Sequence, residues 1–376
     1  MTSSTRTQPF HLSSLLDLKL LLIFLPIALI ARVLHWGEVI VFVSAALAII
    51  PLSEIIGEST EQIAHKLGPN IGGIINATLG NAAELIITIF ALQAGLTELV
   101  KASIVGSILG NLLLVTGTSF LVGGLKNGLQ TFERRTASMN ATMVILAFLV
   151  LAIPSGFDQA LLTGTGANGA NELLFSEGIA FVMIVLYALS MLYTLRDPQS
   201  RMHLPVEEDE EPKTEVNMTR ALIMLALATI GIVLMSEALV ATVEPVATSL
   251  HLSEFFVGII VVPLIGNVAE HVVAIKVAYN NQMDLSISIS LGSSLQIALF
   301  VAPVLVFVSL LFSNKLLLVF NPYELIALAT ASIVVTLVSQ DGESNWMEGA
   351  QLLAVYLILA LAFFLVPSAA GLSATP

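Results

Sequence analysis

The five residues Gly80-Asn81-Ala82-Ala83-Glu84 recur with one substitution as Gly266-Asn267-Val268-Ala269-Glu270, 186 positions further along the chain. Both copies lie inside long apolar runs, so each puts a carboxylate where lipid-spanning segments rarely have one. The same offset relates Gly106-Ser107 to Gly292-Ser293. The chain therefore contains an internal repeat, and its polar residues repeat with it.

The composition is that of a membrane protein. Of the 376 residues, 56% are hydrophobic and 11% are charged, and the mean hydropathy is +0.94. Soluble domains carry about 25% charged residues, so the lipid bilayer is the expected surrounding. The net charge of -13 argues against nucleic acid as a partner. The absence of cysteine excludes disulfides, thiolate metal sites and cysteine nucleophiles.

The apolar runs predict an all-α integral membrane protein, because a spanning backbone must satisfy its own hydrogen bonds. Eleven transmembrane helices are expected, at about residues 18–34, 38–56, 71–95, 99–124, 137–155, 175–195, 219–241, 254–279, 285–313, 322–338 and 346–367. A signal peptide is the competing interpretation of the first run, although no clear A-x-A site follows it. Either way the other ten helices keep the same orientation.

The repeat divides the chain into four parts: an N-terminal segment with the first helix (1–36), a five-helix repeat (37–196), an acidic linker (197–218) and a second five-helix repeat (219–376). Because five is odd, the two motif-bearing helices must cross the membrane in opposite directions. The repeats are then inverted, which brings Glu84 and Glu270 together near the midplane, as in secondary transporters.

The distribution of basic residues predicts the orientation. With the N-terminus in the cytoplasm, eleven of the 14 Lys and Arg residues face the cytoplasm, in keeping with the positive-inside bias. The C-terminus is then outside.

The two motif glutamates are the strongest candidates for a functional site. A carboxylate at that depth costs about 2.5 kcal/mol or more unless it faces a cavity or a counter-ion, and no Lys or Arg lies centrally in any predicted span. Asn81 and Asn267 precede them by three residues, on the same helix face. Together with backbone carbonyls freed near Gly80, Pro263 and Gly266 and with water, they offer the oxygen ligands that calcium takes.

The same pair predicts proton coupling. Two close carboxylates in a poorly solvated site cannot both stay ionised without a cation, so one divalent ion and two protons compete for one place. The alternative is a structural pair that stays protonated and only joins helices. Its weakness is that the motif occurs twice at corresponding positions.

A second group of polar residues is expected to support the ion pathway. This group has a competing structural interpretation, as helix packing or solvated surface. It comprises Ser107, Asn111, Ser294, Gln296, His271, Glu54 and Glu237. The acidic run Glu207, Glu208, Asp209, Glu210 and Glu211 reads either as a solvated linker or as a segment that attracts calcium on the cytoplasmic side.

At these residues the sequence resembles the calcium/proton exchangers of the CAX family, within the calcium/cation antiporter superfamily. The matching motifs span nearly the whole chain: Ile49-Ile50-Pro51-Leu52, Gly80 to Glu84, Gly106-Ser107-Ile108-Leu109-Gly110-Asn111, Gly266 to His271, and Gly292-Ser293-Ser294-Leu295-Gln296. The resemblance implies one helix followed by two inverted sets of five, with Glu84 and Glu270 as the residues that bind calcium and exchange protons. It also implies Asn81, Asn267, Ser294 and Gln296 beside them.

The sequence therefore predicts a secondary antiporter, not an enzyme, that exports cytoplasmic calcium in exchange for protons and needs no cofactor. The resemblance also implies protons, not sodium, as the coupling ion, because alanine precedes both glutamates where the sodium/calcium branch of the superfamily typically has proline. A manganese/proton or sodium-coupled exchanger is the alternative, followed by a cation channel. The compact chain favours a prokaryotic plasma membrane over a vacuolar one, and a homo-oligomer remains open.

Overall fold

The computed structural model describes residues 18–163, 170–196 and 217–365, and nearly all of them are helical. The acidic run Glu207 to Glu211, for which we predict either a linker or a calcium-attracting role, lies outside these residues.

The helices of the described residues group into eleven segments, as predicted from the apolar runs. Eight are long and apolar enough to cross a membrane, two contain the shorter apolar helices Ala82–Gln93 and Pro322–Val338, and the first segment consists of the short helices Leu18–Ile23 and Phe24–Leu34. In chain order the segments are η2 (Leu18–Ile23) with α1 (Phe24–Leu34); α2 (Glu38–Leu67); α3 (Pro69–Leu79) with α4 (Ala82–Gln93); α5 (Thr97–Leu109) with η3 (Gly110–Val115) and α6 (Thr116–Asn127); α7 (Arg134–Thr163); α8 (Ala170–Arg196); α10 (Met218–Ser249); α11 (Glu254–Phe256) with η4 (Val257–Val261) and α12 (Val262–Tyr279); α13 (Met283–Gln296) with η5 (Ile297–Val301) and α14 (Ala302–Ser309); α15 (Pro322–Val338); and α16 (Trp346–Leu365).

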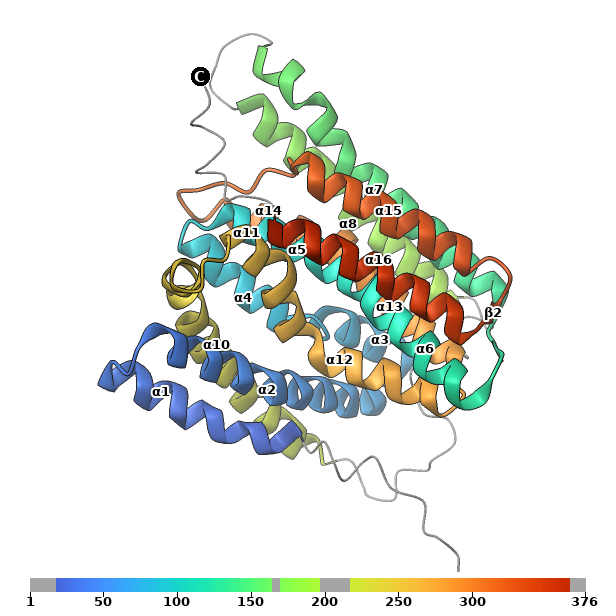
Figure 1. The fold of residues 1–376 in the computed structure, drawn as a ribbon, viewed down its shortest axis with the longest axis horizontal. Coiled ribbons are helices and arrows are strands. Elements are labelled where there is room, and N and C mark those ends of the chain that lie inside the picture. The colour runs from blue at the N-terminus through green and yellow to red at the C-terminus, as the bar shows by residue number, and fades with distance from the viewer. Residues whose placement is uncertain (1–17, 164–169, 197–216, 366–376) are drawn as a thin grey trace, which may run out of the picture.

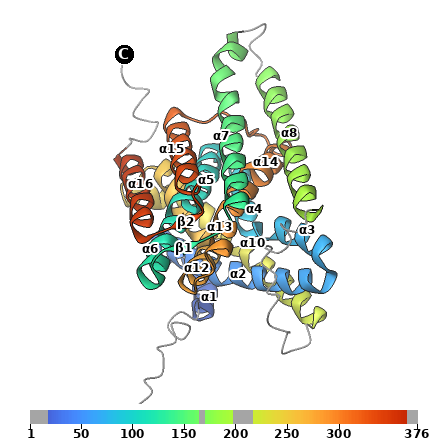
Figure 2. The same ribbon diagram turned by 90° about the vertical axis from the view of Figure 1, so that its right-hand side faces the viewer.

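The helices form one bundle whose outer layers flank a central group. Both views place α1, α2 and α10 together on one side, while α7 and α8 lie on the opposite side (Figures 1 and 2). The central group contains α4, α5, α12 and α13. These are the segments that carry the repeated motifs, so the sequence motifs lie in the interior of the bundle.

Irregular turns interrupt the central helices. The first motif coincides with a helix break, because α3 ends at Leu79 and α4 begins at Ala82. Wide π-helical turns follow the second motif of each repeat, at Gly110–Val115 and Ile297–Val301. Such turns are often found at functional sites.

The second motif helix differs from our expectation. We expected Pro263 and Gly266 to weaken the helix beside Glu270 as Gly80 does beside Glu84, but α12 is continuous from Val262 to Tyr279. The irregularity is instead the π-turn η4, just before Pro263. Pro263 lies inside one continuous helical run, Glu254–Tyr279, directly after this π-turn, so the N–H group that proline lacks coincides with the irregular turn and not with a break beside Glu270.

The C-terminal end of α12 is held by the last residues of α6 and by the loop that follows it. The side chains of Lys126, Asn127 and Gln130 donate hydrogen bonds to the carbonyl oxygens of Ala278 and Tyr279. These donors satisfy carbonyls that a helix end leaves without partners. The loop itself is joined to the loop before α16 by a two-stranded antiparallel ladder of β1 (Gln130–Thr131) and β2 (Glu343–Ser344).

Helices α6 and α16 approach each other closely because their facing positions are glycines. A Cβ atom on Gly349 would lie 2.6 Å from the carbonyl oxygen of Gly117, and one on Gly117 would lie 3.1 Å from the carbonyl oxygen of Gly349. Small residues at such crossings are the usual means of packing helices in membranes.

We expect Gly349→Val to destabilise the protein by about 1–3 kcal/mol, because the added side chain must push backbone aside. Thermal unfolding of purified protein in detergent measures the effect as a lower unfolding temperature. The matched control is Gly178→Val, since Gly178 lies exposed on α8 and a Cβ there meets no described atom within 4 Å. Equal unfolding temperatures for the two variants would contradict the packing described here.

Candidate ion-exchange site

Glu84 lies in the first turn of α4, directly after the break that follows Leu79. Its side chain is buried, with 8% of its surface exposed. A Cβ atom on Gly266 would lie 3.1 Å from Glu84 Oε1. The carboxylate of the first motif therefore rests against the glycine of the second, which leaves it room that a larger side chain would fill.

Glu270 reaches the same region from α12 and is partly exposed. Its Oε2 accepts a hydrogen bond of 2.5 Å from Ser293 Oγ on α13. The carboxylates of Glu84 and Glu270 are close enough to repel each other. The fold thus brings together the two motif glutamates, which are separated by 186 residues in the chain.

The motif asparagines cross-link the two repeats. Asn81 Nδ2 donates to Gln296 Oε1 on α13 over 2.6 Å, and Asn267 Nδ2 donates to Ser107 Oγ on α5 over 3.0 Å. Asn267 Nδ2 also donates to the carbonyl oxygen of Pro263. Each motif asparagine therefore contacts the second polar motif of the other repeat, so four of the repeated segments meet here.

These hydrogen bonds use the amide nitrogens of Asn81 and Asn267, not their amide oxygens. Asn81 and Asn267 are both fully buried, at 0% and 1% exposure. Among the residues that the structure describes, neither Oδ1 atom has a hydrogen-bond partner. A buried acceptor without a donor is costly, and a cation or a water molecule would remove that cost. Two carboxylates and two amide oxygens form the donor set that a hard cation prefers.

Two other predicted residues line the π-turn after the α5 motif. Asn111 is buried at the start of η3, and its Nδ2 has no partner among the described residues. His271 is also buried, with its Cε1 4.0 Å from where a Cβ on Gly110 would be, and its Nε2 likewise has no partner in the described part of the chain. His271 therefore packs beside this turn, next in sequence to Glu270.

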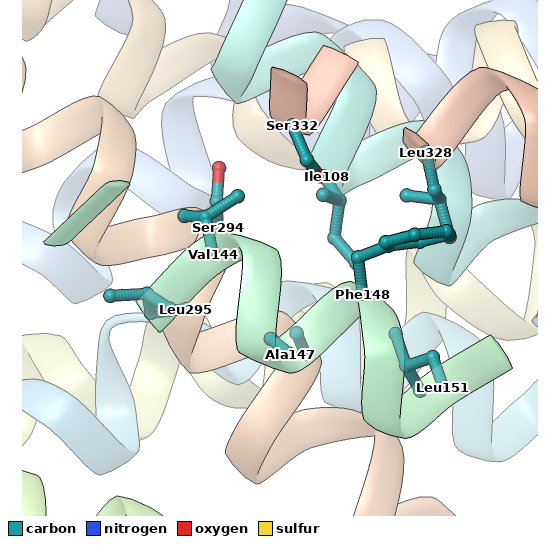
Figure 3. A pocket seen from close by; sticks show the side chains of 10 residues that line it. Ile108, Val144, Ala147, Phe148, Leu151, Ser294, Leu295, Leu328 and Ser332 are labelled. Atoms are coloured by element: carbon teal, nitrogen blue, oxygen red, sulfur yellow. The ribbon is translucent and has the colours of Figure 1, made fainter. Parts of the chain in front are cut away.

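Ser294 faces a different environment. Its hydroxyl donates to the carbonyl oxygen of Ser290, one turn earlier in α13. It also lines a small cavity in which Ser294 and Ser332 are the polar residues and the other lining residues, such as Ile108, Val144 and Phe148, are apolar (Figure 3). Its neighbour Ser293, not Ser294, bonds to the glutamate.

Glu54 and Glu237, which we expected to support the ion pathway, lie on α2 and α10 and not on the motif helices. Glu237 forms an ion pair of 2.7 Å with Arg32 of α1, and both side chains are about half exposed, at 47% and 41%. Glu54 is half-buried on α2. The ion pair anchors α1 to α10, a structural contact that the sequence did not predict.

Sequence analysis did not identify Ser293 as the partner of Glu270. The repeat offset pairs Ser293 with Ser107, yet Ser107 accepts a bond from Asn267 instead of donating to Glu84. Buried Glu324 was also missed. It forms a capping box with Asn321 at the start of α15, and the sequence Asn321-Pro322-Tyr323-Glu324 carries that helix-start signal.

Comparison with known proteins agrees with the motifs. The family described as sodium/calcium exchanger protein matches residues 37–196 and 220–365. The Ca2+/H+ antiporter of Aphanothece halophytica is 42% identical over 360 residues, which cover 92% of this chain and 96% of that protein. The Ca2+/H+ antiporter ChaA of Bacillus subtilis is 43% identical over 346 residues, which cover 91% of this chain and 96% of that protein.

Solved structures share the fold. The structure of native YfkE superposes with a TM-score of 0.80 at 40% identity, covering 93% of this chain and 100% of that one. The H+/Ca2+ exchanger CAX superposes with a TM-score of 0.71 at 17% identity, covering 94% and 92%, which supports the fold alone. The chain is therefore an integral, multi-pass membrane protein of the sodium/calcium exchanger family, and within that family it belongs to the calcium/proton exchangers that its motifs resemble.

Proposed function

We propose that this protein is a secondary active antiporter that exports cytoplasmic calcium in exchange for protons. Glu84 and Glu270 bind either one calcium ion or protons, and the amide oxygens of Asn81 and Asn267 complete the calcium site. Two observations support the proposal: the charge of Glu270 acts on Glu84, and the buried amide oxygens of both motif asparagines lack donors among the described residues. Relatives named Ca2+/H+ antiporter support calcium and protons as the transported ions.

The electrostatics explain why the exchange is obligatory. The paired carboxylates repel each other, and desolvation makes a doubly charged empty site expensive in a low-dielectric bundle. In the described part of the chain, Lys19, Arg32 and Lys101 form ion pairs with other glutamates. The protein therefore changes the face of the membrane to which the site is open only when the site holds calcium or protons.

We propose that the two repeats are inverted relative to each other and that the site is open alternately to the two faces of the membrane. We propose an N-terminus in the cytoplasm and a C-terminus outside, in a prokaryotic plasma membrane. In support, both asparagine bonds join one repeat to the other, as expected for a site built at a repeat interface.

A manganese/proton exchanger is the second candidate, because the same oxygen ligands suit manganese. Uptake into inside-out vesicles with an imposed proton gradient separates the candidates: calcium should dissipate the gradient, and manganese or sodium should do so less. Steady cation flux without a proton gradient would instead indicate a channel.

We expect Glu84→Gln and Glu270→Gln each to reduce calcium-driven proton movement at least about tenfold, as losses in a metal site do. Glutamine keeps the shape but cannot hold a negative charge. The measurement is the calcium-induced dissipation of a proton gradient in vesicles.

The matched control is Glu324→Gln, which changes another buried glutamate. Glutamine can replace glutamate in a capping box, so this variant should transport normally. Wild-type exchange by Glu84→Gln would refute the proposed site.

Calcium and protons should compete on the loading side. When the pH on that side falls, protons occupy the same carboxylates, so the apparent KM for calcium rises while the maximal rate at saturating calcium is unchanged. Initial rates in proteoliposomes at several pH values and calcium concentrations test this. A fall in the maximal rate with a constant KM would show that protons act elsewhere.

A further inference from the structure

The ends of α4 and α12 correspond in the two repeats and have the same backbone geometry. The offset of 186 residues pairs Gly95 with Asn281. Both residues have a positive φ, of 85° and 64°. Each N–H group donates to the carbonyl oxygen three residues earlier, Gly95 to Leu92 over 3.0 Å and Asn281 to Ala278 over 3.1 Å. Because the backbones match, the two helix ends differ in the side chains that surround them.

At the end of α12 these side chains are hydrogen-bond donors. The ammonium of Lys126 donates to the carbonyl oxygen of Tyr279 over 3.0 Å, and Asn127 Nδ2 donates to the same oxygen over 3.2 Å. Gln130 Nε2 donates to the carbonyl oxygen of Ala278 over 3.0 Å. The C-terminal end of a helix carries a partial negative charge, and here one positive charge and two amide groups meet it.

Other residue types stand at the corresponding positions beside the end of α4. By the same offset, the counterparts of Lys126, Asn127 and Gln130 are Phe312, Ser313 and Leu316. Phenylalanine and leucine have no side-chain donor. The ammonium of Lys315 donates to the carbonyl oxygens of Leu310 and Phe312, within its own turn. At these positions, therefore, the charge of Lys126 and the amide of Gln130 have no counterpart.

A cavity of about 380 Å³ lies beside the end of α4. It is lined by residues 92–95 and by residues 311–314, which follow α14. Every lining residue is uncharged, and Gln93, Ser313 and Asn314 are exposed polar residues. A Cβ on Gly95 would lie 2.7 Å from Asn314 Nδ2, so the glycine lets this amide approach α4. The side-chain oxygens and the carbonyl oxygens of the helix end are the kind of ligand that hard cations take.

We propose that a hard cation binds in this cavity, where it takes the place that the Lys126 ammonium has at the end of α12. The donors are neutral oxygen atoms, so calcium, sodium or potassium fits better than a soft metal. Calcium interacts most strongly with the carbonyl dipoles because of its double charge. Since no carboxylate lines the cavity, the dissociation constant for calcium is on the order of 1 mM or weaker.

The cavity is separate from the exchange site. Gln93 follows Glu84 by nine residues in α4, so about 14 Å of helix lies between them. With the proposed orientation, the cavity lies on the outer face of the membrane. A cation there would join the end of α4 to the turn after α14, whichever ions Glu84 and Glu270 exchange.

The effect of cations on the unfolding temperature tests for this site. Purified protein in detergent is titrated separately with calcium, sodium and potassium. The background is the double variant Glu84→Gln with Glu270→Gln, so that the exchange site does not contribute. We expect calcium to raise the unfolding temperature of this background, half-maximally at about 1 mM or above, and sodium and potassium to need higher concentrations.

Two further substitutions assign the effect to the cavity. Phe312→Lys puts an ammonium where Lys126 lies in the other repeat, so the variant should lose most of the calcium-dependent rise. Tyr323→Lys adds the same charge and should keep the rise, because Tyr323 is 49% exposed at the start of α15 and does not line the cavity.

Gln93→Met removes one oxygen ligand from an exposed position where the fold does not depend on it. This variant should need about tenfold more calcium for the same rise. Gln351→Met is the matched control, since Gln351 is also exposed but lies on α16 and does not line the cavity.

The proposal is overturned if calcium, sodium and potassium all leave the unfolding temperature of the background unchanged. It is also overturned if Phe312→Lys responds to calcium as Tyr323→Lys does, or if Gln93→Met responds as Gln351→Met does. Because every protein in this test lacks the exchange site, a failure of the proposed calcium/proton exchange would not alter the result.

Discussion

The bundle is organised around the cost of holding two carboxylates in an apolar interior. Glu84 and Glu270 lie on helices from different repeats, and the two carboxylates are close enough to interact electrostatically. Water does not solvate Glu84 freely, because its side chain is 8% exposed. In the proposed function, protons or a cation neutralise the pair and remove this cost.

The surrounding polar contacts are consistent with that requirement. The donors of Asn81 and Asn267 point toward the opposite repeat and leave both oxygens available. Ser293 holds one glutamate, while Glu84 lies against Gly266 with room beside it. The two glutamates are therefore alike in sequence but held differently, which is expected if the protein is seen in one of two unequal conformations.

Much of this architecture could be predicted from the sequence, because lipid imposes a simple rule on the chain. Apolar run length located the eleven segments, and the rarity of charge inside them singled out the two glutamates. Helix ends were less predictable: α2 continues to Leu67 although its apolar run ends near residue 56. Beyond that point Ser59, Thr60 and Ile63 are buried while Glu58 and Glu61 are exposed, so one side of the helix still packs against the bundle.

The rest of the site could not be predicted, because equivalent residues of the two repeats make different contacts in the folded protein. Ser107 and Ser293 occupy equivalent positions, but only Ser293 donates to a glutamate. Likewise, Gly80 coincides with a break, whereas Gly266 lies within a continuous helix. A repeated sequence predicts what the two halves share, and packing in one conformation decides how they differ.

Proton release on calcium binding tests the shared site most directly. Calcium can be titrated into the purified protein in two buffers that differ in their heat of protonation. If calcium displaces protons from Glu84 and Glu270, the measured heat will depend on the buffer, and that dependence will vanish in Glu84→Gln. Calcium binding with the same heat in both buffers, and no proton release, would contradict a common site for the two ions.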